Sequence, residues 1–220
     1  MKTFNELQEG VYDPNILKAF FLAGGPGSGK SYVVSRTTGG LGLKIVNSDN
    51  AFEKLLKDAG LSLKMPPEEE EPRDVVRARA KAITKKQQKN YIEGRLGLII
   101  DGTGKDYDKI AKQATQLKQL GYDVHMIFVN TSLDTALERN AARPRSIPEP
   151  IVVKSWKSVQ SNIGKFSQYF RQNFVVVDNN NAGEDVFKKV FKQVMSLAKS
   201  RVQNTLGQQW IANELAKRRR

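Results

Sequence analysis

The sequence predicts a three-layer α/β fold with a five-stranded, mainly parallel sheet flanked by helices. Two observations support this prediction. Five short apolar segments recur along the chain, at Lys18–Ala23, Gly42–Asn47, Leu96–Ile100, Tyr122–Val129 and Phe174–Val177. Segments with a helical spacing of apolar residues lie between them, such as 110–120 and 186–194. Alternating strands and helices indicate βαβ units, which place helices on both faces of a parallel sheet.

The domain organisation follows from the spacing of these segments. We expect one domain over residues 1–200 and an insertion at 60–95 between the second and third strands. The insertion starts with an acidic, proline-bounded segment at 65–72, interpreted as an exposed loop, and continues with a basic helix from about Arg73 to Gly94. Such an insertion often closes over an acceptor, although a solvated loop without that role is the alternative.

Residues 201–220 form a separate C-terminal segment. Val202, Leu206 and Trp210 follow at steps of four, and the segment ends in four consecutive basic residues. This pattern predicts a basic amphipathic helix. Docking on the core is the preferred interpretation, and an anionic surface or a partner is the alternative.

The composition limits the possible chemistry. The 220 residues include no cysteine, which excludes disulfides, thiolate metal sites and cysteine nucleophiles. The first ten residues lack the features of a secretory signal, and no apolar run reaches the roughly 20 residues that cross a bilayer. We therefore expect a soluble, cytoplasmic protein with no membrane partner.

The formal net charge is +13, and residues 139–220 contain 16 basic against 5 acidic residues. This excess makes a nucleic-acid partner possible, whereas basic helices that merely face solvent are the alternative.

A complete phosphate-binding motif follows the first predicted strand. The pattern G-x-x-x-x-G-K-[ST] is matched by Gly24, Gly25, Pro26, Gly27, Ser28, Gly29, Lys30 and Ser31. Glycines let backbone N–H groups turn toward phosphates, Lys30 supplies a positive charge, and the Ser31 hydroxyl ligates Mg²⁺. The motif therefore predicts a P-loop that binds ATP with Mg²⁺.

A second metal ligand is expected at the end of the third strand. Leu98, Ile99 and Ile100 lead into Asp101, which should lie at the same edge of the sheet as the phosphate loop. Gly102 follows, where many hydrolytic P-loop proteins carry a glutamate that activates water. This favours transfer to an acceptor over hydrolysis, although a structural role for Asp101 is the alternative.

Asp49 is the candidate general base. It follows the second strand, at the carboxyl edge of the sheet, where a carboxylate can accept the proton of a hydroxyl acceptor. Ser48 or Asp49 could instead be the N-cap of a helix over 50–60, which requires no catalytic role.

Arg139, Arg143 and Arg145 surround a proline-broken segment, which predicts an arginine-bearing lid at 139–150. Guanidinium groups suit phosphate oxygens, so these arginines could contact the nucleotide. The alternative is that they lie on a solvent-exposed surface without such a role. His125 lies inside an apolar segment, so we expect a strand residue rather than a catalyst.

At these residues the sequence resembles the zeta-toxin family of P-loop kinases, which is related to the 5′-polynucleotide kinases of bacteriophages. The matching stretches are Gly24–Ser31, Val46–Asp49, 101–105 with the segment to Val129, and Glu138–Val153. The most specific is Asp-Gly-Thr-Gly-Lys, which precedes a helix and Gly-Tyr-Asp-Val.

The resemblance implies roles for individual residues. Asp49 would be the general base and Lys30 the phosphate-binding lysine, and Arg139 and Arg145 match transition-state arginines. Three further residues fall where the toxin holds its acceptor, UDP-N-acetylglucosamine: Asp101, Thr103 and Lys105. Asp101 and Lys105 replace the family's Glu and Arg, which keeps the charge but shortens the reach.

Together these observations predict an ATP- and Mg²⁺-dependent kinase that phosphorylates a hydroxyl group. A small molecule or nucleotide sugar is the first acceptor hypothesis, and the 5′-hydroxyl of a polynucleotide is the second. A nucleic-acid-binding ATPase without an acceptor is the third.

Overall fold

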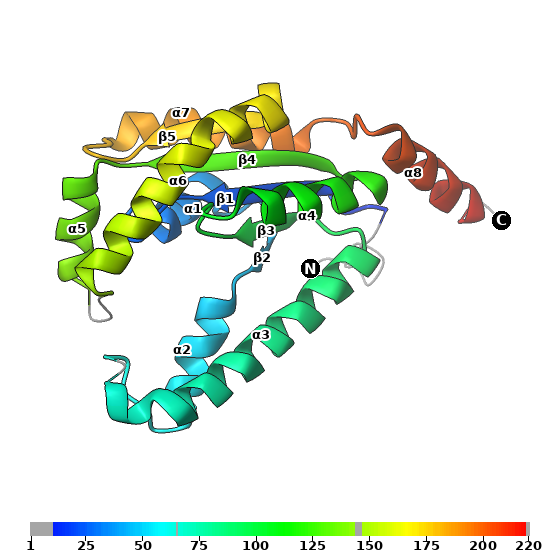
Figure 1. Ribbon diagram of the computed structural model, residues 1–220. Coiled ribbons are helices and arrows are strands. Elements are labelled where there is room, and N and C mark those ends of the chain that lie inside the picture. Colours follow the sequence, from blue (N-terminus) through cyan, green and yellow to red (C-terminus); the bar gives the residue numbers. More distant parts are fainter. Residues whose placement is uncertain (1–10, 65, 144–146, 219–220) are drawn as a thin grey trace.

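The computed structural model describes residues 11–64, 66–143 and 147–218. Its centre is a five-stranded sheet in the order β2-β3-β1-β4-β5, and all neighbouring pairs are parallel (Figure 1). The strands are β1 (Lys18–Ala23), β2 (Lys44–Val46), β3 (Leu98–Asp101), β4 (Asp123–Asn130) and β5 (Phe174–Asp178). The predicted fold class is therefore confirmed, and each expected strand is present.

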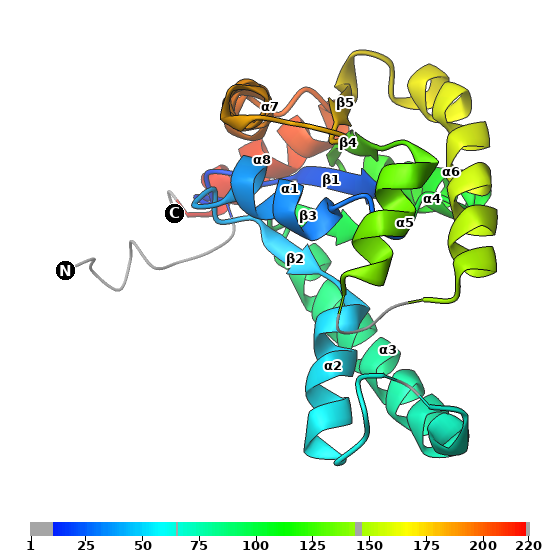
Figure 2. The same ribbon diagram turned by 90° about the vertical axis from the view of Figure 1, so that its left-hand side faces the viewer.

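Eight α-helices occur in the described part of the chain. They are α1 (Lys30–Thr38), α2 (Ser48–Asp58), α3 (Glu70–Glu93), α4 (Tyr107–Gln119), α5 (Leu133–Ala141), α6 (Glu149–Phe170), α7 (Glu184–Lys199) and α8 (Thr205–Lys217). Short 3-10 turns occupy Pro67–Glu69 and Arg171–Asn173. Residues of α1 and α7 pack on one face of the sheet, and residues of α4 and α6 pack on the other (Figures 1 and 2).

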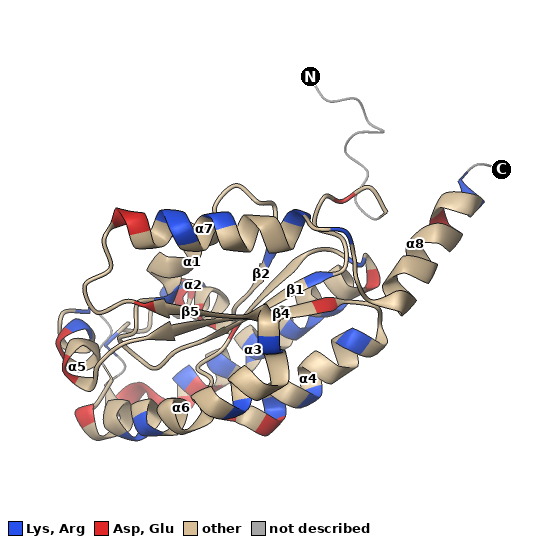
Figure 3. Cartoon of the chain, turned by 90° about the horizontal axis from the view of Figure 1, so that it is seen from above, with Lys and Arg blue, Asp and Glu red and all other residues tan. Residues whose placement is uncertain are grey.

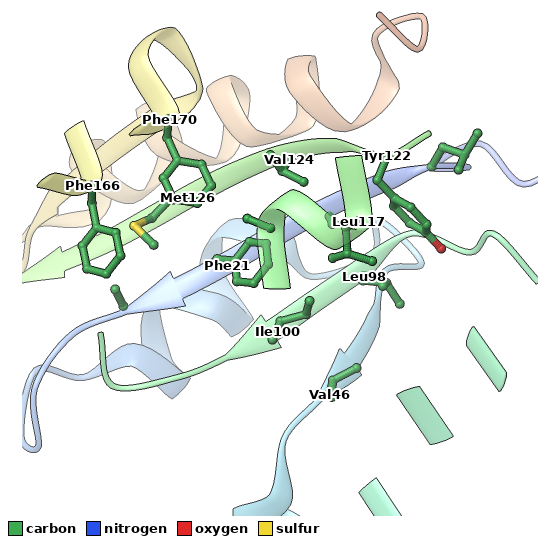
Figure 4. Packing of buried hydrophobic residues seen from close by; sticks show 14 of the residues in the cluster. Phe21, Val46, Leu98, Ile100, Leu117, Tyr122, Val124, Met126, Phe166 and Phe170 are labelled. Atoms are coloured by element: carbon green, nitrogen blue, oxygen red, sulfur yellow. The ribbon is translucent and has the colours of Figure 1, made fainter. Parts of the chain in front are cut away.

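The central strand β1 explains why the fold has two cores. All six of its residues are buried, as expected for a parallel strand covered on both faces. Successive side chains point to opposite faces, so Phe20 and Phe21 belong to different clusters. Figure 4 shows the cluster under α4 and α6, where Phe21 lies near Met126, Phe166 and Phe170. Burial on both faces fixes β1, and the loop that follows it, in place.

Helices α2 and α3 form an arm that projects from the sheet (Figures 1 and 2). A small cluster of its own, Phe52, Leu56 and Ala80, joins the two helices. The expectation of an exposed loop over 65–72 was wrong for most of this segment, because 67–69 form a 3-10 turn and α3 begins at Glu70 rather than Arg73. Pro72 is tolerated there because the first-turn N–H groups of a helix have no intrahelical partner.

Helix α8 docks through a close backbone approach. A side chain at Gly207 would collide with the backbone of Gly121, and Trp210 is partly buried against the core. The expected stripe of Val202, Leu206 and Trp210 was wrong, since Val202 is buried before the helix begins and Leu206 is 50% exposed. The last two residues, 219 and 220, lie outside the described part of the chain.

A buried ion pair fixes the start of α8 to the sheet. Lys18 Nζ lies 2.7 Å from Asp123 Oδ2, and their side chains are 1% and 8% exposed. Asp123 also accepts hydrogen bonds from the backbone N–H groups of Gln203 and Asn204, at 2.9 Å each. One carboxylate thus connects β1, β4 and the chain that enters α8.

Replacement of Asp123 by Ala should lower the free energy of unfolding by about 3–5 kcal/mol, because the Lys18 ammonium loses its partner in a buried position. Urea unfolding followed by circular dichroism measures this change. The matched control is Glu214→Ala, which breaks the Lys217–Glu214 pair near the exposed end of α8 and should cost at most about 1 kcal/mol. Equal effects of the two substitutions would contradict the role of Asp123.

His125 is a buried residue of β4, as expected, and its ring stacks on Phe20 with centroids 4.8 Å apart. Burial, together with the nearby Lys18 ammonium, lowers the pKa of His125 to about 4. The imidazole is therefore neutral in the folded protein at neutral pH.

The pKa of His125 predicts a pH dependence of stability. Between its ordinary pKa of 6.5 and about 4, the unfolded chain binds more protons at this site than the folded chain does. Stability that is present above pH 6.5 is therefore lost as the pH falls toward about 4. His125→Phe should reduce this loss by up to about 3 kcal/mol in urea titrations at several pH values. The sequence contains one histidine, so an unchanged pH profile would exclude this explanation.

Candidate active site

The phosphate loop connects β1 to α1, as its sequence predicts. Gly27 and Gly29 have φ values of 76° and 79°, a left-handed conformation that favours glycine. A side chain at Gly27 would also collide with the backbone of Ala136 in α5. Glycine is thus required both for the turn and for the contact with α5.

Lys30 begins α1, and its side chain turns back over the loop. Its Nζ donates a hydrogen bond to the Gly24 carbonyl oxygen at 2.7 Å. Burial lowers the pKa of Lys30, the charge of Asp101 opposes this, Arg143 lowers the pKa further and Asp49 raises it. Three of the predicted site residues therefore lie within electrostatic range of this ammonium.

Asp101 ends β3, directly beside β1 in the sheet. Its Oδ2 accepts a hydrogen bond from Asn47 Nδ2 at 2.7 Å, whereas its Oδ1 is buried and has no hydrogen-bond partner within the described residues. Burial raises the pKa of Asp101 and the Lys30 ammonium lowers it. A buried carboxylate oxygen without a hydrogen-bond partner, next to a phosphate loop, is suited to coordinate a cation.

Asp49 lies in the first turn of α2, and the capping alternative was wrong. Asn47 is the N-cap residue, because its side-chain oxygen accepts the N–H of Asp49 at 2.7 Å. The Asp49 carboxylate instead accepts a hydrogen bond from Arg77 Nη1 at 2.8 Å. Arg77 belongs to α3, and its guanidinium lies 4.0 Å from the centre of the Phe52 ring.

One cavity brings most of these residues together. It has a volume of ≈ 550 Å³ and lies between the phosphate loop, the end of β3 and the start of α2. Its lining includes Lys30, Ser31, Asp49, Asp101, Thr103 and Arg143. Lys105 lies instead in an adjacent cavity of ≈ 330 Å³, whose lining shares Ser48 and Asp101–Thr103 with the first.

The predicted lid arginines occupy different places. Arg143 lines the cavity, whereas Arg139 donates hydrogen bonds to the carbonyl oxygens of Asn179 and Asn180 at 2.7 and 2.9 Å. The side chain of Asn179 in turn donates to the Ser28 carbonyl oxygen at 2.8 Å, so this turn supports the phosphate loop. Arg145 lies outside the described residues.

Three residues at the site were not expected from the sequence: Asn47, Arg77 and Asn179. Asn47 directly precedes Ser48 at the end of a predicted strand. Its position at the carboxyl edge of the sheet could therefore have identified it as a site residue. Arg77 comes from the arm, and its contact with Asp49 depends on how α3 packs on α2. Asn179 lay in a segment interpreted only as a turn.

A parallel sheet, a phosphate loop and a strand-terminal carboxylate beside it are the features of P-loop nucleotide-binding proteins. None of the helices in the described part of the chain is long and apolar enough to cross a membrane.

The sequence profile of the zeta toxin family matches residues 8–189, so the chain belongs to this family. The resemblance inferred from the motifs is therefore confirmed. No curated protein matches the sequence significantly.

Solved structures share the fold at low sequence identity. A chain of the AvrRxo1-ORF1:AvrRxo1-ORF2 complex is 15% identical with a TM-score of 0.59, over 79% of this chain and 63% of that one. A chain of the Pnkp1/Rnl/Hen1 RNA repair complex is 19% identical with a TM-score of 0.52, over 74% and 49%. A putative kinase from Chloroflexus aurantiacus J-10-fl is 15% identical with a TM-score of 0.50, over 82% and 98%. This chain thus spans about half to two thirds of the first two proteins and nearly all of the third.

Lys30→Ala should weaken ATP binding by tenfold or more, since a hydrogen-bonded charge contributes about 1.5–3 kcal/mol. Titration with a fluorescent ATP analogue measures this change, and the melting temperature shows whether the variant is folded. Lys57→Ala is a matched control, because Lys57 is an exposed residue near the end of α2. Unchanged nucleotide affinity in folded Lys30→Ala would contradict the assignment of the loop.

Proposed function

We propose that the protein transfers the γ-phosphate of ATP to a hydroxyl group of a small molecule or nucleotide sugar. The observation that carries this proposal is the cavity of ≈ 550 Å³ that Lys30, Asp49 and Asp101 line together. Phosphoryl transfer depends mainly on positioning and charge neutralisation. A phosphate-binding lysine, a base and a metal-ligating carboxylate around one cavity supply these requirements.

The residues present fit a nucleotide and a magnesium ion. Backbone N–H groups of the glycine-rich loop would hold the phosphates, and Lys30 would neutralise their charge. Ser31 and Asp101 would hold Mg²⁺, and the buried Oδ1 of Asp101 supports this role. The described residues contain no cluster of three acidic or histidine side chains, so Mg²⁺ would take its other ligands from phosphates and water, as it usually does. Bound Mg²⁺ would offset negative charge on the phosphates.

Asp49 is proposed as the general base of the transfer. The acceptor oxygen forms a bond to the γ-phosphorus while the bond from that phosphorus to the ADP oxygen breaks. The proton of the hydroxyl passes to the Asp49 carboxylate, and the products are ADP and a phosphate monoester. The ion pair with Arg77 holds the carboxylate in the lining of the cavity.

Arg143 is proposed to stabilise charge on the transferring phosphoryl group, and its position in the cavity lining supports this. Arg139 and Arg145 are proposed as further transition-state arginines. For Arg139 this requires release from the carbonyl oxygens of Asn179 and Asn180 when nucleotide binds.

Asp101, Thr103 and Lys105 are proposed to bind the acceptor. The adjacent cavity of ≈ 330 Å³ that Lys105 lines is within the size range of small-ligand sites. An acceptor pocket next to Asp49, together with Gly102 after Asp101, favours transfer over simple ATP hydrolysis. A second candidate acceptor is the terminal hydroxyl of a nucleic acid, which the basic groove described below favours.

Asp49→Asn should reduce phosphoryl transfer by roughly a hundredfold or more, because the amide keeps the shape of the side chain but accepts no proton. ATP affinity should stay within about twofold, since the base contacts the acceptor rather than the nucleotide. The assay follows label from γ-labelled ATP into UDP-sugars, nucleosides and 5′-hydroxyl oligonucleotides.

Asp58→Asn, at the other end of α2, is the matched control for loss of one carboxylate. Normal transfer by folded Asp49→Asn would exclude Asp49 as the base and move the role to Asp101. Release of inorganic phosphate without labelling of any hydroxyl compound would support an ATPase instead.

A further inference from the structure

A groove that the proposed chemistry does not use runs between α3 and α4. It has a volume of ≈ 800 Å³, larger than either cavity at the phosphate loop. Its walls are the C-terminal halves of α3 and α4, with Leu120 after α4 and Arg95 between α3 and β3. We call this feature the α3–α4 groove.

The α3–α4 groove is continuous with the candidate active site. Gln88 and Gln113 line both the groove and the adjacent cavity that contains Lys105. That cavity in turn shares Asp101, Gly102 and Thr103 with the cavity at the phosphate loop. A ligand whose hydroxyl lies at Asp49 can therefore extend past Lys105 and along α4.

The lining of this path combines basic and amide side chains with apolar ones, which in the groove are Ile92, Leu117 and Leu120. Its cations beyond the phosphate loop are Lys85, Lys89, Arg95, Lys105 and Lys109. Two of the carboxylates along the path are engaged locally: Asp106 accepts the N–H of Lys109 at 3.0 Å as the N-cap of α4, and Glu93 lies 3.7 Å from Lys89. Four glutamines add neutral donors and acceptors, at positions 88, 113, 116 and 119. Figure 3 marks the Lys and Arg positions of both helices.

The length of the path selects between ligands. Helix α4 has 13 residues, which corresponds to on the order of 20 Å at 1.5 Å per residue. A stacked strand advances about 3.4 Å per nucleotide, so this path matches roughly five or six phosphates of one strand. A nucleotide sugar carries two phosphates and would leave most of the groove unused. Cations spread along the whole path suit a chain of phosphates better than one diphosphate.

We propose that the α3–α4 groove binds a single strand of nucleic acid and directs its terminal hydroxyl to Asp49. The strand-binding step is independent of the kinase proposal, and only the use of the strand as acceptor rests on it. Phosphate contacts along the groove fix the strand in register, and the glutamines contact sugars or base edges. A strand held in this way is the second of the two proposed acceptors, and the groove selects it by its length as well as by its hydroxyl group.

The test is the salt dependence of strand binding by the full chain. The probe is a 12-nucleotide single strand with a 5′-hydroxyl and a 3′-fluorophore, followed by fluorescence anisotropy between low and moderate salt. Each phosphate contact contributes a slope of about −0.7 in log affinity against log salt for single strands. Lys85→Gln/Lys89→Gln should therefore make the slope less steep by about 1.4. Dinucleotides should bind at least tenfold more weakly than the 12-mer.

Lys189→Gln/Lys192→Gln is the matched control, because it removes two exposed charges from α7 on the other face of the sheet. An equal loss of slope in the control, or no strand binding by the full chain at low salt, would overturn the inference. Lys30→Ala should bind the strand with an unchanged slope while it loses transfer. Transfer to a UDP-sugar without strand binding would overturn the groove but leave the kinase intact. Strand binding without labelling of the 5′-hydroxyl, or of the 3′-hydroxyl in a strand that lacks the fluorophore, would support the groove and count against transfer to the strand.

Discussion

The register between β1 and β3 is the constraint on which the candidate site depends. Leu22 pairs with Asp101, and the two chains stay together beyond the strands, since Gly102 N–H donates to Leu22 O at 3.2 Å and Gly24 N–H donates to Thr103 O at 3.0 Å. A slip by one residue would turn the Asp101 side chain to the opposite face of the sheet. The phosphate loop and the carboxylate proposed to ligate the metal are therefore positioned by backbone pairing, not by contacts between their side chains.

Asn47 extends this ordering from the sheet to the arm. Its amide nitrogen contacts Asp101, and its oxygen caps α2 through the N–H of Asp49. Asp49 continues the chain of contacts to Arg77 on α3. One asparagine thus couples the orientation of the carboxylate at the phosphates to that of the proposed base. Strand β2 has only three residues and therefore few hydrogen bonds of its own to the sheet. The contacts of Asn47 directly after it add to this limited pairing.

The sequence was sufficient for the sheet and the phosphate loop because both have local signals. Buried parallel strands appear as apolar runs, and the loop has a fixed spacing of Gly, Lys and Ser. Features set by contacts distant in the sequence could not be predicted in this way. Arg77 reaches Asp49 only through the packing of α3 on α2, and the approach of Gly207 to Gly121 replaces the apolar stripe expected in α8. The predicted N-cap of α2 was one or two residues too late in the sequence. Residue preferences cannot distinguish the true N-cap here, because Asn, Ser and Asp are all favoured at that position.

The arm also divides the molecule energetically. Its interior consists of three buried residues, whereas each face of the sheet has a cluster several times larger. Segments with few buried contacts open at a lower free energy than the rest of a protein. Local opening of the arm would displace Asp49 while the phosphate loop stays folded. Amino-acid changes at Phe52 or Leu56 would then alter turnover at a temperature where the sheet is intact, so catalytic and global thermal stability are separable properties of this fold.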